Sequence, residues 1–336
     1  MKILITGGTG YIGSHTIVEL INAGYEVVVV DNFSNSKPIV LDRLEEITGK
    51  SIKFYELDLC DKDKLRRVFE ENKIDAVMHF AGYKAVGESV AKPLMYYRNN
   101  LDSTLSLLEV MNEYGVKKIV FSSTAAVYGE PKQIPILETD VTNPTNTYGE
   151  TKLAMEKMMK WTDFAHGMKY VSLRYFNVAG ALEDGAIGED HTPETHLIPL
   201  ILQVPLKKRE YITVFGDDYD THDGTCIRDY IHVIDLANAH IKALNYLREG
   251  NESNIFNLGS GNGFTVKEMI EAAKEATGEE IKVVIGERRL GDPAKLVASS
   301  QKAKEILGWT PEFDDVKKMI GDAWNWHKNH PNGFNN

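Results

Sequence analysis

Hydrophobic and polar positions along the first half of the chain follow two patterns in turn. Short apolar runs rich in β-branched residues predict strands, and longer segments with apolar residues every three or four positions predict helices. The predicted strands are 2–6, 27–31, 52–57, 76–80, 118–122 and 170–174, and the predicted helices are 14–23, 62–72, 94–114 and 148–166. This alternation specifies an α/β fold with a doubly wound parallel sheet, whose ligands bind beyond the carboxyl ends of the strands.

The pattern becomes less regular after residue 177. Residues 180–194 are rich in glycine and acids and predict a loop, followed by a short helix from Leu197 and irregular structure to about residue 229. Farther along, 233–247 and 266–277 are the clearest helices. Because 336 residues suffice for two domains, we expect a division into 1–176 and a smaller α/β domain, 177–336.

Composition limits the classes of function. Hydrophobic residues make up 43% and charged residues 26% of the chain, as in ordinary globular proteins. No apolar run approaches the roughly 20 residues of a membrane span, and the first apolar segment is too short for a signal peptide, so we expect a cytoplasmic protein without a membrane partner. The net charge of −11 argues against a nucleic-acid partner. Cys60 and Cys226 are too few for a disulfide framework or a metal cage, so we expect two buried thiols and no metal.

A glycine-rich turn joins the first strand to the first helix. Residues 7–13 are G-G-T-G-Y-I-G, and the second strand ends in Asp31. Glycines let the backbone approach a pyrophosphate, which the N–H groups at a helix N-terminus can hold. The acid can accept hydrogen bonds from a ribose diol but would repel a 2′-phosphate. The segment therefore predicts a Rossmann-type domain that binds NAD rather than NADP, although a merely tight turn remains the alternative.

A possible general base lies at the start of helix 148–166. Tyr148 and Lys152 stand four residues apart and share a face of that helix. A nearby ammonium would lower the pKa of a phenol. The spacing Tyr-x-x-x-Lys also begins at 114 and 128, but the first copy contains a glycine and runs into a strand, and the second contains a proline. Only the copy at Tyr148 opens a long helix, although a surface tyrosine beside a solvated lysine is the alternative.

Several motifs, in order, resemble the extended short-chain dehydrogenase/reductase family. They are residues 7–13, Asp31-Asn32, His79-Phe80-Ala81-Gly82, Ser122-Ser123-Thr124, Tyr148 with Lys152, and Arg174-Tyr175-Phe176-Asn177. Segments 85–90, 228–232 and 291–292 are similar to those of the family members that invert C4 of UDP-hexoses. The resemblance covers nearly the whole chain. It implies that residues 1–176 bind NAD and that 177–336 bind a UDP-sugar.

The resemblance also implies individual ligand contacts. NAD would be bound by Gly7, Gly10, Tyr11, Ile12, Gly13, Asp31, Asn32, Asn35, Ser36, Asp58, Leu59, Phe80, Ala81, Lys84, Asn99, Thr124, Tyr148, Lys152 and Tyr175. The UDP-hexose would be bound by Lys84, Thr124, Tyr148, Asn177, His196, Leu197, Phe215, Arg228, Arg289 and Asp292. The two arginines offer a diphosphate planar, multidentate donors.

The reaction implied is interconversion of UDP-galactose and UDP-glucose through a transient 4-keto sugar, with NAD held throughout. Tyr148 would remove the 4-hydroxyl proton, Lys152 would lower the pKa of that phenol and bond the nicotinamide ribose, and Thr124 would donate to or relay from the sugar oxygen. Many relatives have serine at the position of Thr124. Because threonine keeps the hydroxyl group, we expect the role to be the same. Several have asparagine in place of His196, so a loop histidine without a ligand contact remains the alternative there. Leu296 is intermediate in size at a position that limits the C2 substituent, which leaves N-acetylated sugars open.

Two other functions fit the same fold. Nucleotide-sugar 4,6-dehydratases carry an Asp-Glu pair directly after the threonine, where this chain has Ala125 and Ala126, which cannot move protons. A catalytically silent NAD-binding regulator would have no need of Thr124, Tyr148 and Lys152 together.

Helices 94–114 and 148–166 each carry an apolar face that can cover the sheet. Apolar positions beyond that face would suit a homodimer interface, as the resemblance implies, and packing within one core is the alternative.

Overall fold

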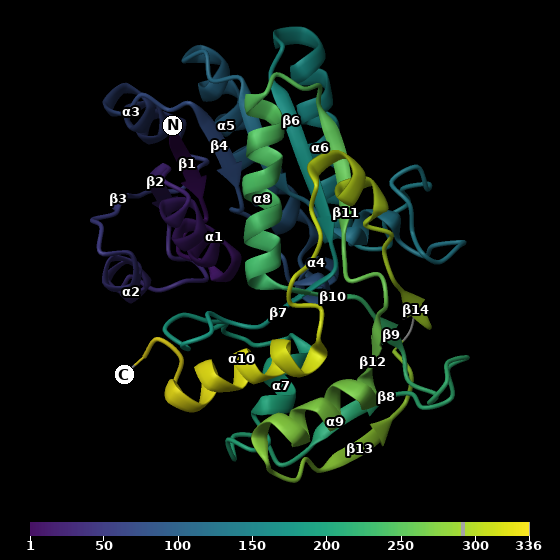
Figure 1. Cartoon of the computed structure of the whole chain (residues 1–336). Helices are drawn as coiled ribbons and strands as arrows, with labels where there is room; N and C mark the ends of the chain where they lie inside the picture. The colour runs from purple at the N-terminus through teal and green to yellow at the C-terminus, as the bar shows by residue number, and fades with distance from the viewer. Residues whose placement is uncertain (290–292, 336) are drawn as a thin grey trace.

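A seven-stranded sheet forms the centre of the protein. The computed structural model describes residues 1–289 and 293–335 (Figure 1). The strand order is β11-β6-β5-β4-β1-β2-β3, and every pairing is parallel. The strands are β1 (Lys2–Thr6), β2 (Glu26–Asp31), β3 (Lys53–Glu56), β4 (Ala76–His79), β5 (Lys118–Ser122), β6 (Lys169–Tyr175) and β11 (Asn254–Leu258). The order reverses between β1 and β4, which makes their carboxyl ends the expected place for a ligand.

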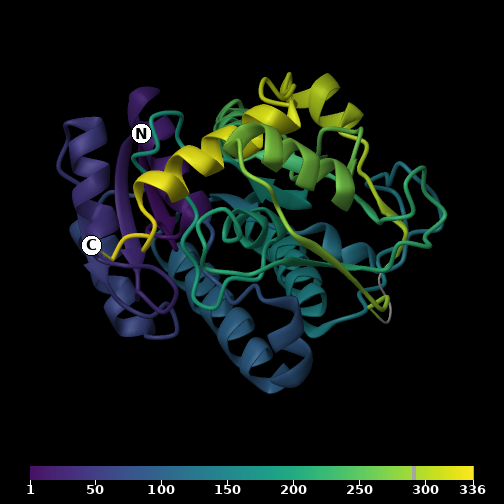
Figure 2. The same cartoon turned by 90° about the horizontal axis from the view of Figure 1, so that it is seen from below.

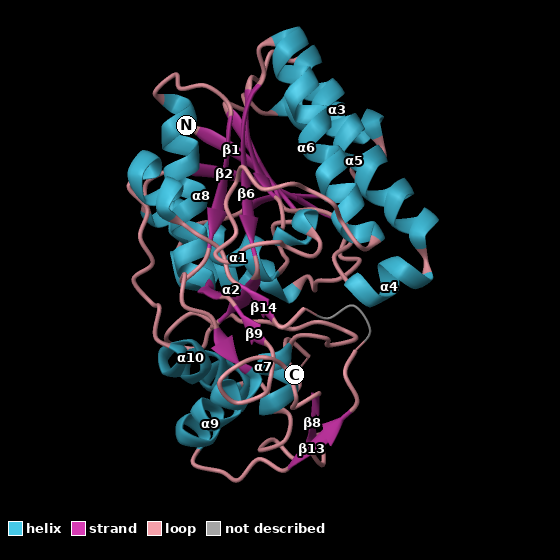
Figure 3. Ribbon diagram, turned by 90° about the vertical axis from the view of Figure 1, so that its right-hand side faces the viewer, coloured by secondary structure: helices cyan, strands magenta, loops and turns pink. Residues whose placement is uncertain are grey.

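Helices cover both faces of this sheet, as Figure 3 shows. One face packs against α1 (Tyr11–Asn22), α2 (Ile39–Thr48) and α8 (Val233–Arg248). The other packs against α3 (Lys62–Glu71), α5 (Pro93–Glu113) and α6 (Thr147–His166). Side chains of β2 alternate between the two cores, since Val29 belongs to the first and Val28 and Val30 to the second. A strand buried on both faces is apolar along its whole length, which explains the run of valines in β2. The predicted α/β class and doubly wound parallel sheet are confirmed.

The C-terminal lobe contains three small sheets and its own apolar core. The sheets pair β7 (Asn177–Ala179) with β10 (Tyr230–His232), β8 (Ile212–Phe215) with β13 (Val283–Gly286), and β9 (Ile227–Arg228) with both β12 (Phe264–Thr265) and β14 (Lys295–Leu296). The helices of this lobe are α7 (Leu197–Leu202), α9 (Val266–Thr277) and α10 (Val316–Asn329). Three short helices complete the described chain: α4 (Val86–Ala91), η1 (Ala125–Tyr128) and η2 (Ala303–Leu307).

The chain returns to the large sheet after residue 177. Helix α8 packs on the same face as α1, and β11 pairs with β6 as the edge strand. Periodicity predicted α8 correctly, but it could not say against which sheet the helix packs. Helices α2, α4 and α10 were not predicted.

Two further observations bear on the composition. Cys226 is buried as expected, whereas Cys60 is exposed, so the prediction of two buried thiols is wrong for Cys60. Cys60 lies two residues after Asp58 in the turn between β3 and α3, and its backbone N–H donates to the Asp58 carboxylate at 2.9 Å. Among the described residues, no helix is long and apolar enough to cross a bilayer.

Candidate active site

The glycine turn between β1 and α1 is packed too closely for side chains. Gly7 has φ of +70°, and a Cβ there would lie 2.7 Å from the backbone nitrogen of Ala81. A Cβ on Gly13 would lie 2.4 Å from the Gly7 carbonyl oxygen. The turn therefore lies directly against the end of β4 and leads into the N-terminus of α1, whose N-cap is Gly10. This is the geometry in which backbone N–H groups can meet a pyrophosphate.

Asp31 organises the turn beside the glycines. Its carboxylate accepts hydrogen bonds from the backbone N–H groups of Thr9 (3.1 Å) and Phe33 (2.9 Å) and from the Ser36 hydroxyl (3.2 Å). The Thr9 hydroxyl lies 2.7 Å from that of Ser36. Thr9 was not among the predicted residues, although its place inside the glycine motif could have indicated it.

A narrow pocket lies over this turn. Its lining includes the predicted Gly10, Tyr11, Asn35 and Ser36, together with Thr9, Ser14, Lys37, Val40, Gly188, Asp190 and Phe334. Asp190 closes the pocket, because its carboxylate pairs with the Lys37 ammonium at 2.7 Å and accepts from the Phe334 backbone N–H at 2.9 Å. Figure 2 shows the C-terminal end of the chain, beyond α10, lying beside the N-terminal segments. The sequence predicted a loop at 180–194, but neither that loop nor the C-terminal segment carries a motif that indicates a place over the glycine turn.

The remaining cofactor candidates lie at or near strand ends of the large sheet. The Asn32 amide donates to Asp58 at 3.2 Å, and Leu59 is buried in the core beside it. The Phe80 ring packs 4.7 Å from that of His240. Ile12 packs against the core, Ala81 donates to Thr6, Asn99 donates to Asn100, and the Tyr175 hydroxyl bonds Ser122.

Tyr148 is held at the first turn of α6. The Asn146 side chain caps this helix by accepting from the Gly149 N–H at 2.9 Å. A Cβ on Gly149 would lie 2.6 Å from the Ala126 carbonyl oxygen, so this glycine lets η1 approach the helix closely. Thr124 is the N-cap of η1, and its hydroxyl bonds Tyr148. The structure thus brings together Thr124 and Tyr148, which are 24 positions apart in the sequence.

Burial governs the pKa values of the two ionisable catalytic candidates. Desolvation raises the pKa of Tyr148 to about 12, which the hydrogen bond with Thr124 only partly offsets. Burial also lowers the pKa of Lys152 to about 8. The Lys152 ammonium lies 6.0 Å from the centre of the Tyr148 ring and donates to the Ser122 carbonyl at 2.9 Å. The Tyr148 shift is therefore opposite to our prediction, because the ammonium is directed at a backbone carbonyl and desolvation dominates.

A buried ion pair fixes α6 against the sheet. The Glu156 carboxylate, one turn beyond Lys152, accepts two hydrogen bonds from the Arg174 guanidinium of β6 and one from the Ser123 hydroxyl at 2.6 Å. Both partners of the pair are 4% exposed. Arg174 was part of the family resemblance, but its role here is to orient the helix that carries Tyr148 and Lys152.

The predicted UDP-sugar residues of the C-terminal lobe come from separate segments. Asn177 begins β7, His196 is the N-cap of α7, Leu197 is the first residue of that helix, and Arg228 ends β9. Phe215 ends β8, and the Arg289 guanidinium carbon lies 3.9 Å from the centre of its ring. Leu296 pairs with Arg228 and packs on the cluster that contains Ala125 and Leu153. Asp292 lies outside the described residues.

Comparisons with known proteins agree with this geometry. The family described as "NAD dependent epimerase/dehydratase family" matches residues 3–259. The chain is 55% identical to the UDP-glucose 4-epimerase of Lacticaseibacillus casei, over 99% of both proteins, and 50% identical to that of Bacillus subtilis, again over 99% of both. A crystal structure of a UDP-glucose 4-epimerase is 56% identical over the full length of both chains, with a TM-score of 0.95. That of Bifidobacterium longum, in complex with NAD⁺ and UDP, is 46% identical over 99% of this chain and 100% of that one, with a TM-score of 0.94. The chain belongs to the NAD-dependent epimerase/dehydratase family.

Proposed function

We propose that this protein interconverts UDP-galactose and UDP-glucose by inverting C4 with a tightly bound NAD. The observation that carries this proposal is the group formed by Thr124, Tyr148 and Lys152 at the carboxyl end of β5, beside a glycine turn suited to a dinucleotide. Full-length similarity to several UDP-glucose 4-epimerases supports it.

The reaction makes a defined demand on each side chain. When bound, NAD supplies the hydride acceptor for C4 and a positive charge on the nicotinamide. Tyr148 removes the proton of the 4-hydroxyl and later returns one to the same oxygen on the inverted sugar, while Thr124 holds that oxygen by a hydrogen bond. Lys152 stabilises the phenolate and bonds the ribose. Burial raises the pKa of Tyr148 and so opposes the phenolate, whereas the positive charge of a bound nicotinamide would favour it.

Retention of the cofactor is a second demand, because the 4-keto sugar could not be reduced again if the reduced cofactor dissociated before the hydride was returned. The pocket over the glycine turn supports retention, because Asp190 and Phe334 cover it from the loop after β7 and from the C-terminal tail. A dinucleotide seated there could leave only after those contacts opened.

We assign ligands to the chain as predicted, with NAD on residues 1–176 and the UDP-sugar on 177–336. The assignment concerns binding rather than sheet membership, because α8 and β11 complete the large sheet. We propose that Arg228 and Arg289 donate hydrogen bonds to the diphosphate. The Phe215 ring stacks against the Arg289 guanidinium and helps to hold it in place. A cytoplasmic location, where NAD and UDP-sugars are supplied, remains part of this proposal.

Incubation of the purified protein with UDP-galactose and no added cofactor tests the function. UDP-glucose should form, and denaturation of the protein should release NAD. A 4-keto-6-deoxy sugar would instead indicate a dehydratase, which Ala125 and Ala126 disfavour. Absence of any conversion would indicate a silent regulator. A parallel assay with UDP-N-acetylgalactosamine would define the sugar range that Leu296 leaves open.

A homodimer is also part of the proposal. Four large apolar side chains on α4, α5 and α6 are strongly exposed: Val90 (62%), Leu94 (80%), Trp161 (65%) and Phe164 (83%). Exposed apolar surface on adjacent helices is typical of a protein interface. Sedimentation at micromolar concentration should give a dimer, and Leu94→Glu with Phe164→Glu should give a monomer. Ile306→Glu, which changes an apolar side chain exposed elsewhere, is the control and should leave the dimer intact. A monomeric unmodified chain would contradict the proposal.

A further inference from the structure

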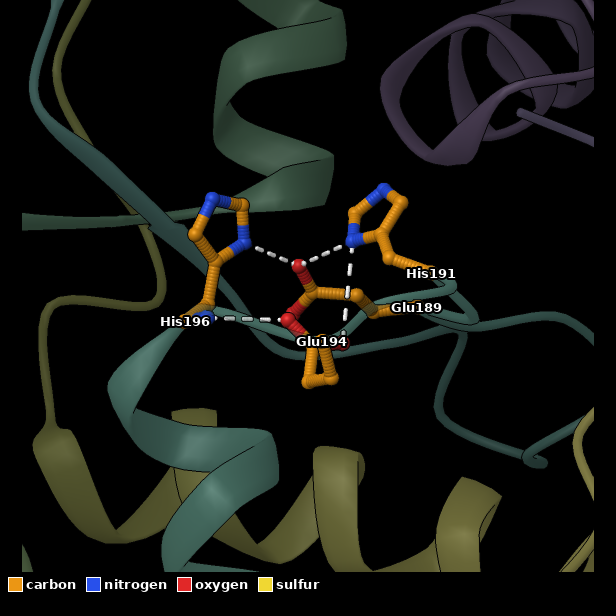
Figure 4. A group of neighbouring side chains, drawn as sticks. All are labelled: Glu189, His191, Glu194 and His196. Carbon is orange, nitrogen blue, oxygen red and sulfur yellow. Dashed lines mark hydrogen bonds and ion pairs between the residues drawn. The ribbon is translucent and has the colours of Figure 1, made fainter. Parts of the chain in front are cut away.

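Four side chains that the reaction does not require as acids or bases converge in the loop between β7 and α7. Glu189, His191, Glu194 and His196 each offer one ligand atom, and these four atoms all lie within 4.8 Å of one another. Figure 4 shows the Glu189 carboxylate between the two imidazole rings, each turned so that its Nδ1 points at that carboxylate. All four residues lie within a segment of eight, so a single loop supplies the whole group.

The spacing of the ligand atoms suits a small tetrahedral ion. His191 Nδ1 lies 3.0 Å from Glu189 Oε1 and 3.6 Å from Glu194 Oε2, and His196 Nδ1 also contacts Glu189 Oε1. Bonds of about 2.0–2.2 Å to a tetrahedral ion separate its ligands by about 3.3–3.6 Å. Because the four atoms already lie within 4.8 Å of one another, side-chain movements of about 1 Å would place them around one ion.

Burial and charge favour a cation at this place. The side chains of Glu189, His191 and Glu194 are 6%, 8% and 10% exposed, and that of His196 is 41% exposed. Two ionised carboxylates in a largely dry pocket require compensation by positive charge.

We propose that Glu189, His191, Glu194 and His196 bind one Zn²⁺ ion. Imidazole nitrogens combined with carboxylate oxygens in tetrahedral arrangement are a ligand set typical of Zn²⁺, whereas Mg²⁺ and Ca²⁺ prefer six or more oxygens. The ion replaces protons as the bridge between the imidazoles and Glu189, and its two charges neutralise the two carboxylates.

The position of this zinc site indicates a structural role that rests on the proposed function. The Glu189 carbonyl accepts from the Trp326 indole of α10 at 3.0 Å, and Asp190 follows it to close the pocket over the glycine turn. His196 is the N-cap of α7, and Leu197 begins that helix. The ion thus connects the loop segment at Asp190, which closes the cofactor pocket, to the N-terminus of α7, where Leu197 is a proposed UDP-sugar contact. With Nδ1 on the metal, His196 presents its Nε2–H as a fixed donor.

Lys84 is the cation that faces this group from the large lobe. Its ammonium lies 2.8 Å from Nε2 and 3.3 Å from Nδ1 of His191. An imidazole that binds a metal through Nδ1 keeps its proton on Nε2 and can no longer accept from an ammonium. Metal binding would therefore release Lys84 toward the ligands that it is expected to contact. Without a metal, Lys84 and protonated histidines would balance the two carboxylates, which is the alternative that the experiment must separate.

Metal content of the purified full-length protein tests the site directly. The protein is produced without a histidine tag, dialysed against zinc-free buffer and analysed for bound zinc by elemental mass spectrometry. Its affinity for Zn²⁺ is measured by competition with a chromogenic chelator. We expect one zinc per chain. Loss of an outer-shell partner weakens metal binding by about 10–100-fold. His191→Ala and Glu194→Ala each remove a direct ligand and should weaken Zn²⁺ binding by more than that. His222→Ala, which removes an exposed histidine paired with Glu268, is the matched control and should bind zinc as the unmodified chain does.

Thermal unfolding supplies a second measurement. After removal of metal with a chelator, Zn²⁺ should raise the Tm of the unmodified chain and of His222→Ala, but not of His191→Ala, and Mg²⁺ should raise none of them. Absence of bound zinc together with no response to added Zn²⁺ would show a metal-free ion-pair network and overturn the site. Equal zinc in His191→Ala would place the metal elsewhere and also overturn it. Full epimerase activity in a chain that binds no zinc refutes the metal site alone, whereas zinc bound by these residues in an inactive chain refutes the proposed function alone.

Discussion

The large sheet and the C-terminal lobe position their candidate ligand residues in different ways. In the sheet, these residues follow the ends of consecutive parallel strands, as Gly7 follows β1, Asp31 ends β2 and Phe80 follows β4. Parallel strands align their carboxyl ends, so each residue reaches the same edge through its own strand. The cofactor half of the site therefore depends on regular, apolar secondary structure.

In the C-terminal lobe, the candidate residues depend on short pairings between segments far apart in the sequence. Arg228 is placed by pairing with Leu296, and Phe215 by pairing with Gly286. His196 depends on Glu189 in its own loop. The candidate residues of the large lobe are therefore held by its buried core, whereas those of the small lobe rely on individual contacts that can be altered one at a time.

The largest expected effect concerns Tyr148, the proposed general base, which lies in the large lobe. Tyr148→Phe should reduce turnover by about 10²–10⁴ while leaving UDP binding nearly unchanged, because it removes only the hydroxyl that transfers the proton. Tyr114→Phe is the matched control, since Tyr114 has the same spacing to a lysine but caps the end of α5. Steady-state rates and UDP titration provide the measurements, and full activity in Tyr148→Phe would refute the assignment.

Ion pairs should differ between the two lobes almost as strongly. Arg174→Met leaves the Glu156 carboxylate buried without its partner, and we expect a loss of about 3–5 kcal/mol in the free energy of unfolding. Lys282→Met breaks an exposed pair with Glu210 in the C-terminal lobe and should leave that free energy unchanged within error. Denaturant unfolding compares the two variants. Equal losses would mean that the lobes do not differ as argued.

Glycines offer a third comparison. Gly13→Ala should cost about 1–3 kcal/mol and deplete bound NAD, because the new methyl group meets the Gly7 carbonyl oxygen. Gly321→Ala, inside α10 of the other lobe, meets no atom within 4 Å and should raise stability by up to about 1 kcal/mol. Nucleotide released on denaturation and the Tm of each variant are the measurements. Retention of normal NAD by Gly13→Ala would show that the turn can relax.

The smallest effect comes from buried histidines of the large lobe. Burial lowers the pKa of His79 to about 3, and those of His15 and His240 to about 4. An unfolded histidine, with a pKa near 6.5, binds a proton in a window where the folded one does not, so stability should fall as pH drops from about 6.5 to 4. His79→Gln removes one of the protons taken up on unfolding. It should therefore reduce the slope of the free energy of unfolding against pH by about 1.4 kcal/mol per pH unit. Unfolding between pH 7 and 5 measures it, and an unchanged slope would contradict a neutral His79.

Local patterns in the sequence were sufficient to predict the fold class, most elements of the large sheet, the glycine turn and the helix that carries Tyr148. These features are local, because strand and helix periodicity, the spacing from Tyr148 to Lys152 and the conformation of Gly7 are set within a few residues. As predicted, neither duplicate of the spacing opens a long helix, since Tyr114 is the C-cap of α5 and Tyr128 lies in η1.

The folded structure set the features that depend on contacts between distant segments. It returned α8 and β11 to the large sheet, placed the tail at Phe334 over the cofactor pocket and directed the Lys152 ammonium at a carbonyl instead of the phenol. It also gathered Glu189 and its partners around one point. Periodicity reports which face of an element is buried, but not what covers that face. Desolvation and long-range pairing, which set the pKa of Tyr148 and the position of Arg228, are properties of the folded chain alone.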